Sequence, residues 1–238
     1  MAEPSRVITA LRRSVRVEAA PGPVPGRPAR TSVLLNPRRL EVLLAAASYP
    51  GIHLRSLSRL LLSSLPALRH HVGVLEAEGL VRTVRRGRRA HVFVTSLVPP
   101  REEAFLLILG DPVDRRVIVR VGAGPGAGRR ELAAGLRMPR STLDRSLRRL
   151  ETAATLRVTR RSGRARVWPS AAWRRFEASC AEAAEGRIAR FAAVLEKQGL
   201  HPAVEPSEPG RARILVDGPR GRLRFVYVAN PLLAPAAA

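Results

Sequence analysis

Two short stretches of the sequence concentrate arginine. Their arginines are Arg85, Arg86, Arg88 and Arg89 in VRRGRRA (84–90), and Arg160, Arg161 and Arg164 in RRSGR (160–164). A guanidinium group presents five donors in a rigid fork that matches phosphate oxygens. The whole chain of 238 residues carries a formal net charge of +23, so a polyanion is the first partner to expect.

The charge excess is concentrated in the middle of the chain. It is +7 over residues 36–98 and +9 over residues 99–169. The single cysteine, Cys180, excludes an internal disulfide framework and fits a reducing cytosol. The longest dense apolar run, AFLLILG (104–110), is too short to span a membrane, and the first residues lack the apolar core of a secretory signal. We therefore expect a cytoplasmic protein without a membrane partner.

A shift of 75 residues superimposes one part of the sequence on the next without a gap. It relates Asn36-Pro37 to Asp111-Pro112, and Gly51 to Gly126. The same shift relates Leu57, Leu61, Leu68, Val72, Leu75, Arg85, Arg86 and Phe93 to Leu132, Leu136, Leu143, Leu147, Leu150, Arg160, Arg161 and Trp168. Caps, apolar positions and arginines agree in one register, which indicates an internal repeat.

Each copy predicts three helices followed by a hairpin. Asn36 or Asp111 caps a helix that begins with proline, and Gly51 or Gly126 breaks the chain after it. A short second helix follows, and the inner face of the third has i, i+4, i+7 spacing at Leu68, Val72 and Leu75. Two alternating segments around the arginine clusters predict the strands of the hairpin.

This order of elements and the residues within it resemble winged helix-turn-helix proteins, namely tandem archaeal-type transcriptional regulators and ArsR- and MarR-like bacterial regulators. The resemblance covers about residues 35–169. The segments that carry it are LNPRRLEVLLAAASYPGIHLRSLSRLL (35–61), LRHHVGVLEAEGLV (68–81) and RRELAAGLRMPRSTLDRSLRRLE (129–151). The second copy departs from the pattern at Ala153-Ala154-Thr155, where glycine and leucine are usual, which weighs against a wing that starts in the same way.

The resemblance implies that the third helix of each copy enters the major groove of double-stranded DNA and that the hairpin wing contacts the backbone or the minor groove. Ser64, Ala67, Arg69 and His70 are then the first copy's helix candidates. Arg140, Ser141, Thr142, Arg145 and Arg148 are those of the second. The wing candidates are Arg85, Arg86, Arg88, Arg89, Arg160, Arg161 and Arg164. Arginine can bond two guanine acceptors, whereas the wings should supply affinity rather than sequence choice.

The remaining segments complete the expected organisation. The fold class is α+β, mainly α, with a basic flexible arm at 1–34 and winged helix domains at 35–98 and 99–169. A long amphipathic helix at 170–199 and a segment at 200–238 with linker, β-hairpin and tail follow. The helix carries an apolar stripe that runs from Trp173 to Leu195. We hypothesise a homodimer through 170–199; the alternative is packing of this stripe against residues 100–110 of the same chain.

The sequence gives little support for a metal site, a nucleotide-binding loop or a catalytic cysteine. His70 and His71 point about 100° apart on a helix, so a metal site is disfavoured. The glycine-rich loop VGAGPGAGRRE (121–131) lacks the lysine of a nucleotide-binding loop, and Cys180 lies on an apolar helical face. We expect neither an enzyme nor a cofactor.

The expected function is a transcriptional regulator associated with the nucleoid. The alternatives are an architectural chromatin protein that binds without sequence choice, and a winged helix protein-protein scaffold. RNA binding is less favoured because aromatic residues make up only 4% of the chain, which leaves few stacking platforms.

Overall fold

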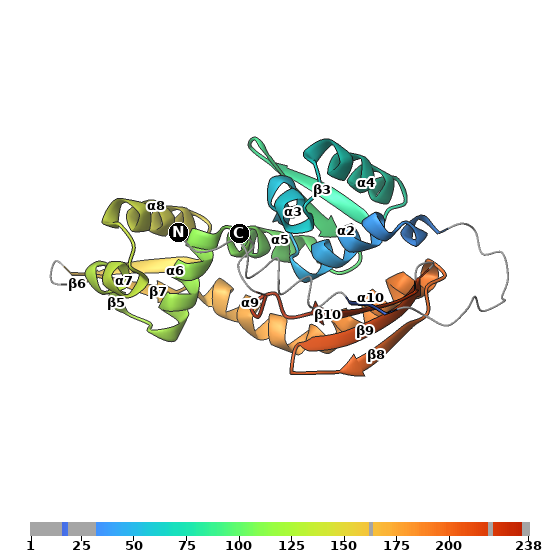
Figure 1. The fold of residues 1–238 in the computed structure, drawn as a ribbon. Coiled ribbons are helices and arrows are strands. Elements are labelled where there is room, and N and C mark those ends of the chain that lie inside the picture. Colours follow the sequence, from blue (N-terminus) through green and yellow to red (C-terminus); the bar gives the residue numbers. More distant parts are fainter. Residues whose placement is uncertain (1–15, 19–31, 162–163, 219–220, 235–238) are drawn as a thin grey trace.

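The computed structural model describes residues 16–18, 32–161, 164–218 and 221–234 (Figure 1). A 3-10 turn, η1 (Val33–Leu35), leads into a first unit of three helices and a three-stranded sheet. Its elements are α2 (Pro37–Ser48), β2 (Ile52–His53), α3 (Leu54–Leu61), α4 (Leu65–Ala77), β3 (Val81–Arg86) and β4 (Arg89–Val94). The antiparallel strand order β2-β4-β3 places the short strand after α2 beside the hairpin. This is the order of three helices and a hairpin that the sequence predicts, with α4 as the third helix; we call the β3–β4 hairpin the wing and the whole the first winged unit.

A second unit has the same element order, each element lying 75 residues further along the chain. A 3-10 turn, η2 (Pro100–Glu102), and α5 (Glu103–Leu109) precede it. Its elements are α6 (Pro112–Ala123), β5 (Ala127–Gly128), α7 (Arg129–Leu136), α8 (Arg140–Thr152), β6 (Leu156–Arg161) and β7 (Arg164–Pro169), and its strand order is β5-β7-β6. The predicted fold class, α+β and mainly α, is confirmed.

Side-chain caps start the first helix of each unit. The Asn36 side chain accepts hydrogen bonds from the backbone N–H groups of Arg38 and Arg39, and Asp111 accepts from those of Val113 and Asp114. Proline follows each cap, at a position where no backbone donor is needed. These local signals fix where each unit begins, so the sequence alone could locate them.

The glycine after each first helix makes room for an aromatic residue of the wing. Gly51 and Gly126 have φ angles of +79° and +81°, and a Cβ atom there would lie 2.9 Å from the ring of Phe93 or 2.7 Å from that of Trp168. The left-handed φ and the close approach of the ring each exclude a side chain at these two positions. The glycine therefore packs the turn directly against the last wing strand in both units.

The second wing starts in the same way as the first, contrary to the expectation from Ala153-Ala154-Thr155. Ala154 adopts a left-handed φ of +52° at the position of Gly79, which has a φ of +68°. Thr155 is fully buried where the first unit has Leu80. The β6–β7 register then follows with Leu156 opposite Pro169. Alanine tolerates the left-handed conformation at a modest cost in energy, so the wing forms without the glycine.

The predicted single helix over 170–199 is wrong, because the structure has two helices. They are α9 (Ala171–Glu182), capped by the Ser170 side chain, and α10 (Ala184–Lys197), and the chain breaks at Ala183. The buried Arg187 side chain donates to the carbonyl oxygen of Cys180 at 3.3 Å and pairs with Glu102 at 2.6 Å. This contact with the segment between the two units stabilises the break.

The apolar stripe of these helices is covered within the chain. Phe105 of α5 stacks on Phe176 with ring centroids 4.9 Å apart and meets Trp173 edge-on, and Phe191 contacts Phe225 and Tyr227 of the C-terminal sheet. All seven positions of the stripe are buried: Trp173, Phe176, Cys180, Ala184, Ile188, Phe191 and Leu195. The intramolecular alternative therefore accounts for the stripe, and the dimer hypothesis loses the surface on which it was based.

The C-terminal sheet has more strands than the predicted hairpin. The hairpin itself is present as β9 (Arg211–Gly218) and β10 (Gly221–Val228). The strand β8 (Pro202–Pro206) adds to one edge, and β1 (Arg16–Glu18) pairs with β10 at the other. The interpretation of 1–34 as a flexible arm is wrong for residues 16–18 and for η1, where Leu34 is buried; residues 1–15 and 19–31 lie outside the described residues.

The two third helices lie on the same side of the molecule. In Figure 1, α4 and α8 lie along the top, whereas α9, α10 and the four-stranded sheet lie below them. The β3–β4 hairpin points upward, and the strands β6 and β7 run toward the left end. The C-terminal elements thus support both units from beneath and leave the outer faces of α4 and α8 uncovered.

Candidate nucleic-acid interface

The outer face of α8 carries a row of basic and hydroxyl side chains. Leu143, Leu147 and Leu150 point into the core, and Arg140, Ser141, Arg145 and Arg148 on the other face are exposed, with Thr142 half-buried beside them. No carboxylate of the described residues lies within ion-pair distance of Arg140, Arg145 or Arg148. Their guanidinium groups are therefore available to bind an external acceptor.

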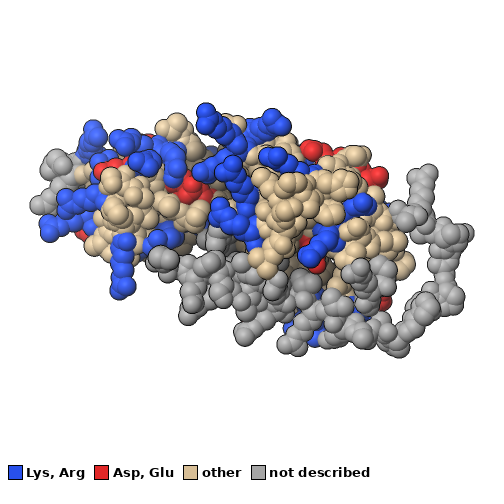
Figure 2. Space-filling view, turned by 45° about the horizontal axis from the view of Figure 1, so that its top comes forward, with Lys and Arg blue, Asp and Glu red and all other residues tan. Residues whose placement is uncertain are grey.

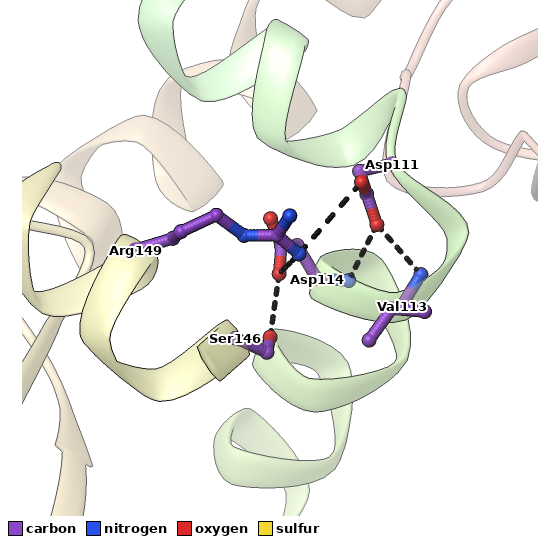
Figure 3. A network of polar contacts seen from close by, with 5 residues as sticks. All are labelled: Asp111, Val113, Asp114, Ser146 and Arg149. Atoms are coloured by element: carbon purple, nitrogen blue, oxygen red, sulfur yellow. Dashed lines mark hydrogen bonds and ion pairs between the residues drawn. The ribbon is translucent and has the colours of Figure 1, made fainter. Parts of the chain in front are cut away.

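Arg149, next along the helix, has a different role. Its Nη2 atom lies 2.7 Å from Oδ1 of the buried Asp114, and the Ser146 hydroxyl donates to the same oxygen at 2.5 Å (Figure 3). Asp111, whose carboxylate caps α6, lies 3.8 Å from Arg149. Burial raises the pKa of Asp114, although both of its donors oppose this shift. The network fixes α8 against α6 and so holds the row of exposed side chains in place.

The outer face of α4 has fewer donors. Ala67, Arg69 and His70 are exposed as predicted. The Ser64 hydroxyl accepts from the backbone N–H of Ala67 at 3.3 Å, so it serves as the helix cap. The positions that correspond to Asp114, Ser146 and Arg149 hold Arg39, His71 and Val74, which cannot form the same network. The first unit thus presents a weaker set of hydrogen-bonding groups than the second.

The wing arginines extend into solvent where the structure describes them. Arg85, Arg86, Arg88 and Arg89 are exposed around Gly87, which has a φ of +57°. Arg160 is exposed on the second wing. The backbones of Arg161 and Arg164 pair at the end of that hairpin, but their side chains lie outside the described part of the chain.

Sequence reasoning missed basic residues on the second helix of each unit. Arg55 on α3 and Arg130 on α7 are related by the 75-residue shift. Arg59 lies one turn further along α3, and Arg137 directly follows α7; all four are exposed. No acidic side chain of the described residues pairs with them. The 75-residue relation between Arg55 and Arg130 was the signal that could have identified them.

The C-terminal sheet differs from the winged units in how its charge is balanced. Arg211, Arg213 and Arg222 pair with Glu208, Glu205 and Asp217 at 2.8, 3.1 and 2.8 Å. Figure 2, in which the top of Figure 1 comes forward, shows basic side chains spread over both winged units. The face that α4 and α8 share therefore carries basic side chains of both units without acidic partners among the described residues.

A histidine pair connects the first wing to the turn beneath it. His91 Nδ1 lies 2.8 Å from the carbonyl oxygen of Gly51, and His53 Nδ1 accepts from the backbone N–H of Arg55 to cap α3. The two rings meet edge-on at 5.6 Å. In the second unit, Arg166 donates to the corresponding Gly126 carbonyl at 3.1 Å. The side chain at this carbonyl is thus an imidazole in the first unit and a guanidinium in the second.

We expect the first unit to lose stability as the pH falls. Burial, the neighbouring histidine and Arg89 lower the pKa of His53, and burial lowers that of His91. Folding therefore favours the neutral rings, so this contribution is complete above the unfolded pKa of about 6.5 and declines below it. Protonated His53 also loses its acceptor for Arg55.

The measurement is the free energy of urea unfolding between about pH 7.5 and pH 5. The double variant His53→Asn, His91→Gln retains a capping side chain without a titratable ring, so its stability should fall less than that of the wild type. A curve parallel to the wild type would contradict the role of these histidines. His71, whose pKa is also lowered by burial, remains in both proteins as a common background.

Metal ligands, a membrane-spanning helix, the glycine-rich loop and Cys180 can each be examined in the described residues. They contain no group of three or more metal-ligating side chains and no helix long and apolar enough to cross a membrane. The glycine-rich loop at 121–131 forms the end of α6, a turn and the start of α7. Burial raises the pKa of the Cys180 thiol to about 12, which suits a structural role.

Comparisons with protein-family models and with curated proteins gave no match. Among solved structures, the crystal structure of T. acidophilum IdeR matches with 14% sequence identity, covering 88% of this chain and 97% of that chain, at a TM-score of 0.22. At this TM-score the likeness shows neither a shared fold nor a shared function.

Proposed function

We propose that the protein is a double-stranded DNA-binding transcriptional regulator with winged helix domains at 35–98 and 99–169. In this proposal α4 and α8 enter the major groove, and the two wings contact the backbone or the minor groove. The observation that carries the proposal is the row of exposed, unpaired arginines on α8, supported from behind by the Asp114–Ser146–Arg149 network.

The side chains on α8 suit base recognition. An arginine can donate to both major-groove acceptors of guanine, and a serine or threonine hydroxyl can bond a base or a phosphate. Arg145 lies in the middle of the row, so it is the strongest candidate for a base contact, with Arg140 and Arg148 on either side. The α4 helix, with Arg69 and His70, contributes fewer contacts and less sequence choice.

The wing arginines suit phosphate contacts. Arg85, Arg86, Arg88 and Arg89 lie on a hairpin tip, where flexible guanidinium groups can follow the backbone of a duplex. Such contacts raise affinity for any sequence. Arg55 and Arg130, at the starts of the second helices, would add to the same effect.

Arg145→Ala should reduce sequence discrimination. The preferred site is identified first, by selecting the duplexes that the protein binds from a pool of random sequences. Loss of a bidentate contact to guanine should then weaken binding to that site by about 1–3 kcal/mol and should weaken binding to a random duplex less. Fluorescence anisotropy titrations on both duplexes measure the difference.

Arg190→Ala removes the same charge from an exposed position on α10, outside the two winged units, and should leave both affinities nearly unchanged. Equal losses on the preferred and the random duplex for Arg145→Ala would refute its role in base reading.

A second candidate is an architectural DNA-binding protein, which the donor-poor face of α4 favours. In that case random DNA at modest excess displaces the chain from any probe, whereas a regulator retains its preferred site. In either case we propose action by binding rather than catalysis, with the protein in the cytoplasm on the nucleoid.

A further inference from the structure

Arg115 on α6 is buried in an unusual environment. Only 8% of its surface is exposed, and its Nη2 atom donates to the carbonyl oxygens of Pro231 at 3.1 Å, Leu232 at 2.9 Å and Ala234. Its Nη1 atom donates to Leu109 at 3.4 Å. Among the described residues, no carboxylate lies within ion-pair distance of it. Backbone carbonyl groups therefore surround this cation, and three of the four belong to the C-terminal segment.

The winged fold itself does not require an arginine at this position. The corresponding residue of the first unit is Leu40, which is buried in the core. A buried guanidinium is costly unless polar groups surround it, so Arg115 depends on the carbonyl groups that reach it from the chain's far end. The C-terminal segment thus explains the one buried arginine on α6.

The same segment also contacts the first unit. Pro231 and Ala234 line a small cavity together with Tyr49 and Pro50, which follow α2, and with Arg115. Asn230 and Leu233 pack on Gly210 at the start of β9. Residues 230–234 therefore lie between the turn after α2, the helix α6 and the C-terminal sheet.

We propose that residues 231–234 act as a strut, with Arg115 as its positioning residue, which fixes α8 relative to α4. This rests on the proposed function: if both helices contact one duplex, the strut sets the number of base pairs between the two contacted segments. The chain would then read spacing as well as sequence.

The variant Arg115→Leu tests the strut while keeping each unit folded, because leucine is the residue of the first unit. Duplexes carrying the preferred site are lengthened or shortened by about one to three base pairs between its two halves. Wild type should lose about tenfold or more in affinity when the spacing changes. The variant should bind all spacings with similar affinity, whereas an unchanged spacing preference would overturn the proposal.

Two further variants complete the test. Termination after Asn230 removes the carbonyl groups and should also abolish the spacing preference. Arg116→Met is the matched control, because among the described residues Arg116 donates only within its own unit, to the Leu136 carbonyl at 2.5 Å, and it should keep the preference. A loss of stability alone would not make a folded variant indifferent to spacing.

A second measurement works without DNA. Spin labels at Ala67→Cys on α4 and Ser141→Cys on α8, in a Cys180→Ala background, report the distance between the two helices. The distribution should be narrow with Arg115 and broad with Arg115→Leu; equal widths would overturn the strut. Failure of the wild type to bind any duplex would instead refute the proposed function and leave this distance test valid.

Discussion

Raising the salt concentration from about 50 to about 200 mM should weaken duplex binding by roughly a thousandfold or more, if about six to ten phosphates are neutralised. The structure supplies enough cations for this number. The described chain exposes unpaired arginines at Arg69, Arg85, Arg86, Arg88, Arg89, Arg140, Arg145, Arg148 and Arg160. Each phosphate contact releases condensed counterions, so the slope of log affinity against log salt counts them. Fluorescence anisotropy on one duplex at several salt concentrations gives the slope.

Two sets of variants locate the contacts that produce this slope. Replacing Arg85, Arg86, Arg88 and Arg89 together by glutamine should reduce the slope by about 3 to 4, since each contact contributes about 0.9. A comparison set of three arginines that pair with acids in the C-terminal sheet, Arg211, Arg213 and Arg222, should leave the slope unchanged on replacement by glutamine. The opposite ranking would place the DNA on the sheet and contradict the account.

Glu102→Leu should destabilise the protein by about 3–5 kcal/mol. The Glu102 carboxylate lies 2.6 Å from Arg187 Nη2, and the two side chains are only 9% and 6% exposed. Removal of the acid leaves a buried guanidinium without its counter-ion. The pair joins the segment between the two units to α10, so its loss acts on the whole C-terminal support. Urea unfolding measures the change.

The double variant Glu102→Leu, Arg187→Met distinguishes a missing partner from a general packing defect. Two apolar side chains leave no uncompensated charge, so most of the stability should return. A double variant as unstable as Glu102→Leu alone would show that the ion pair is not the cause.

Local signals made the two winged units predictable. These signals act within a few residues, and each occurs once in both copies of the internal repeat. They are the caps Asn36 and Asp111, the glycines Gly51 and Gly126, and the leucine spacing of the third helices. The exposed candidates on α4, α8 and the wings follow from the same helical faces. Their predicted contacts with DNA remain predictions.

Long-range contacts account for what sequence reasoning missed. The break at Ala183 accompanies the pairing of Arg187 with Glu102, which lies 85 residues away. The strand β1 pairs with β10 near the other end of the chain, and the Arg115 contacts span up to 119 residues. Periodicity within a short window reports a buried face but not its partner, so the stripe at 170–199 indicated a dimer when its partners lay in the same chain.

The most direct test of the central claim is a methylation-protection footprint of the preferred duplex with one chain bound. Guanine N7 faces the major groove, so protection reports helices that lie there. The account predicts two separate protected segments in a one-to-one complex, with Arg145→Ala removing protection from one of them. A single protected segment, or none, would contradict the claim that α4 and α8 engage the same duplex.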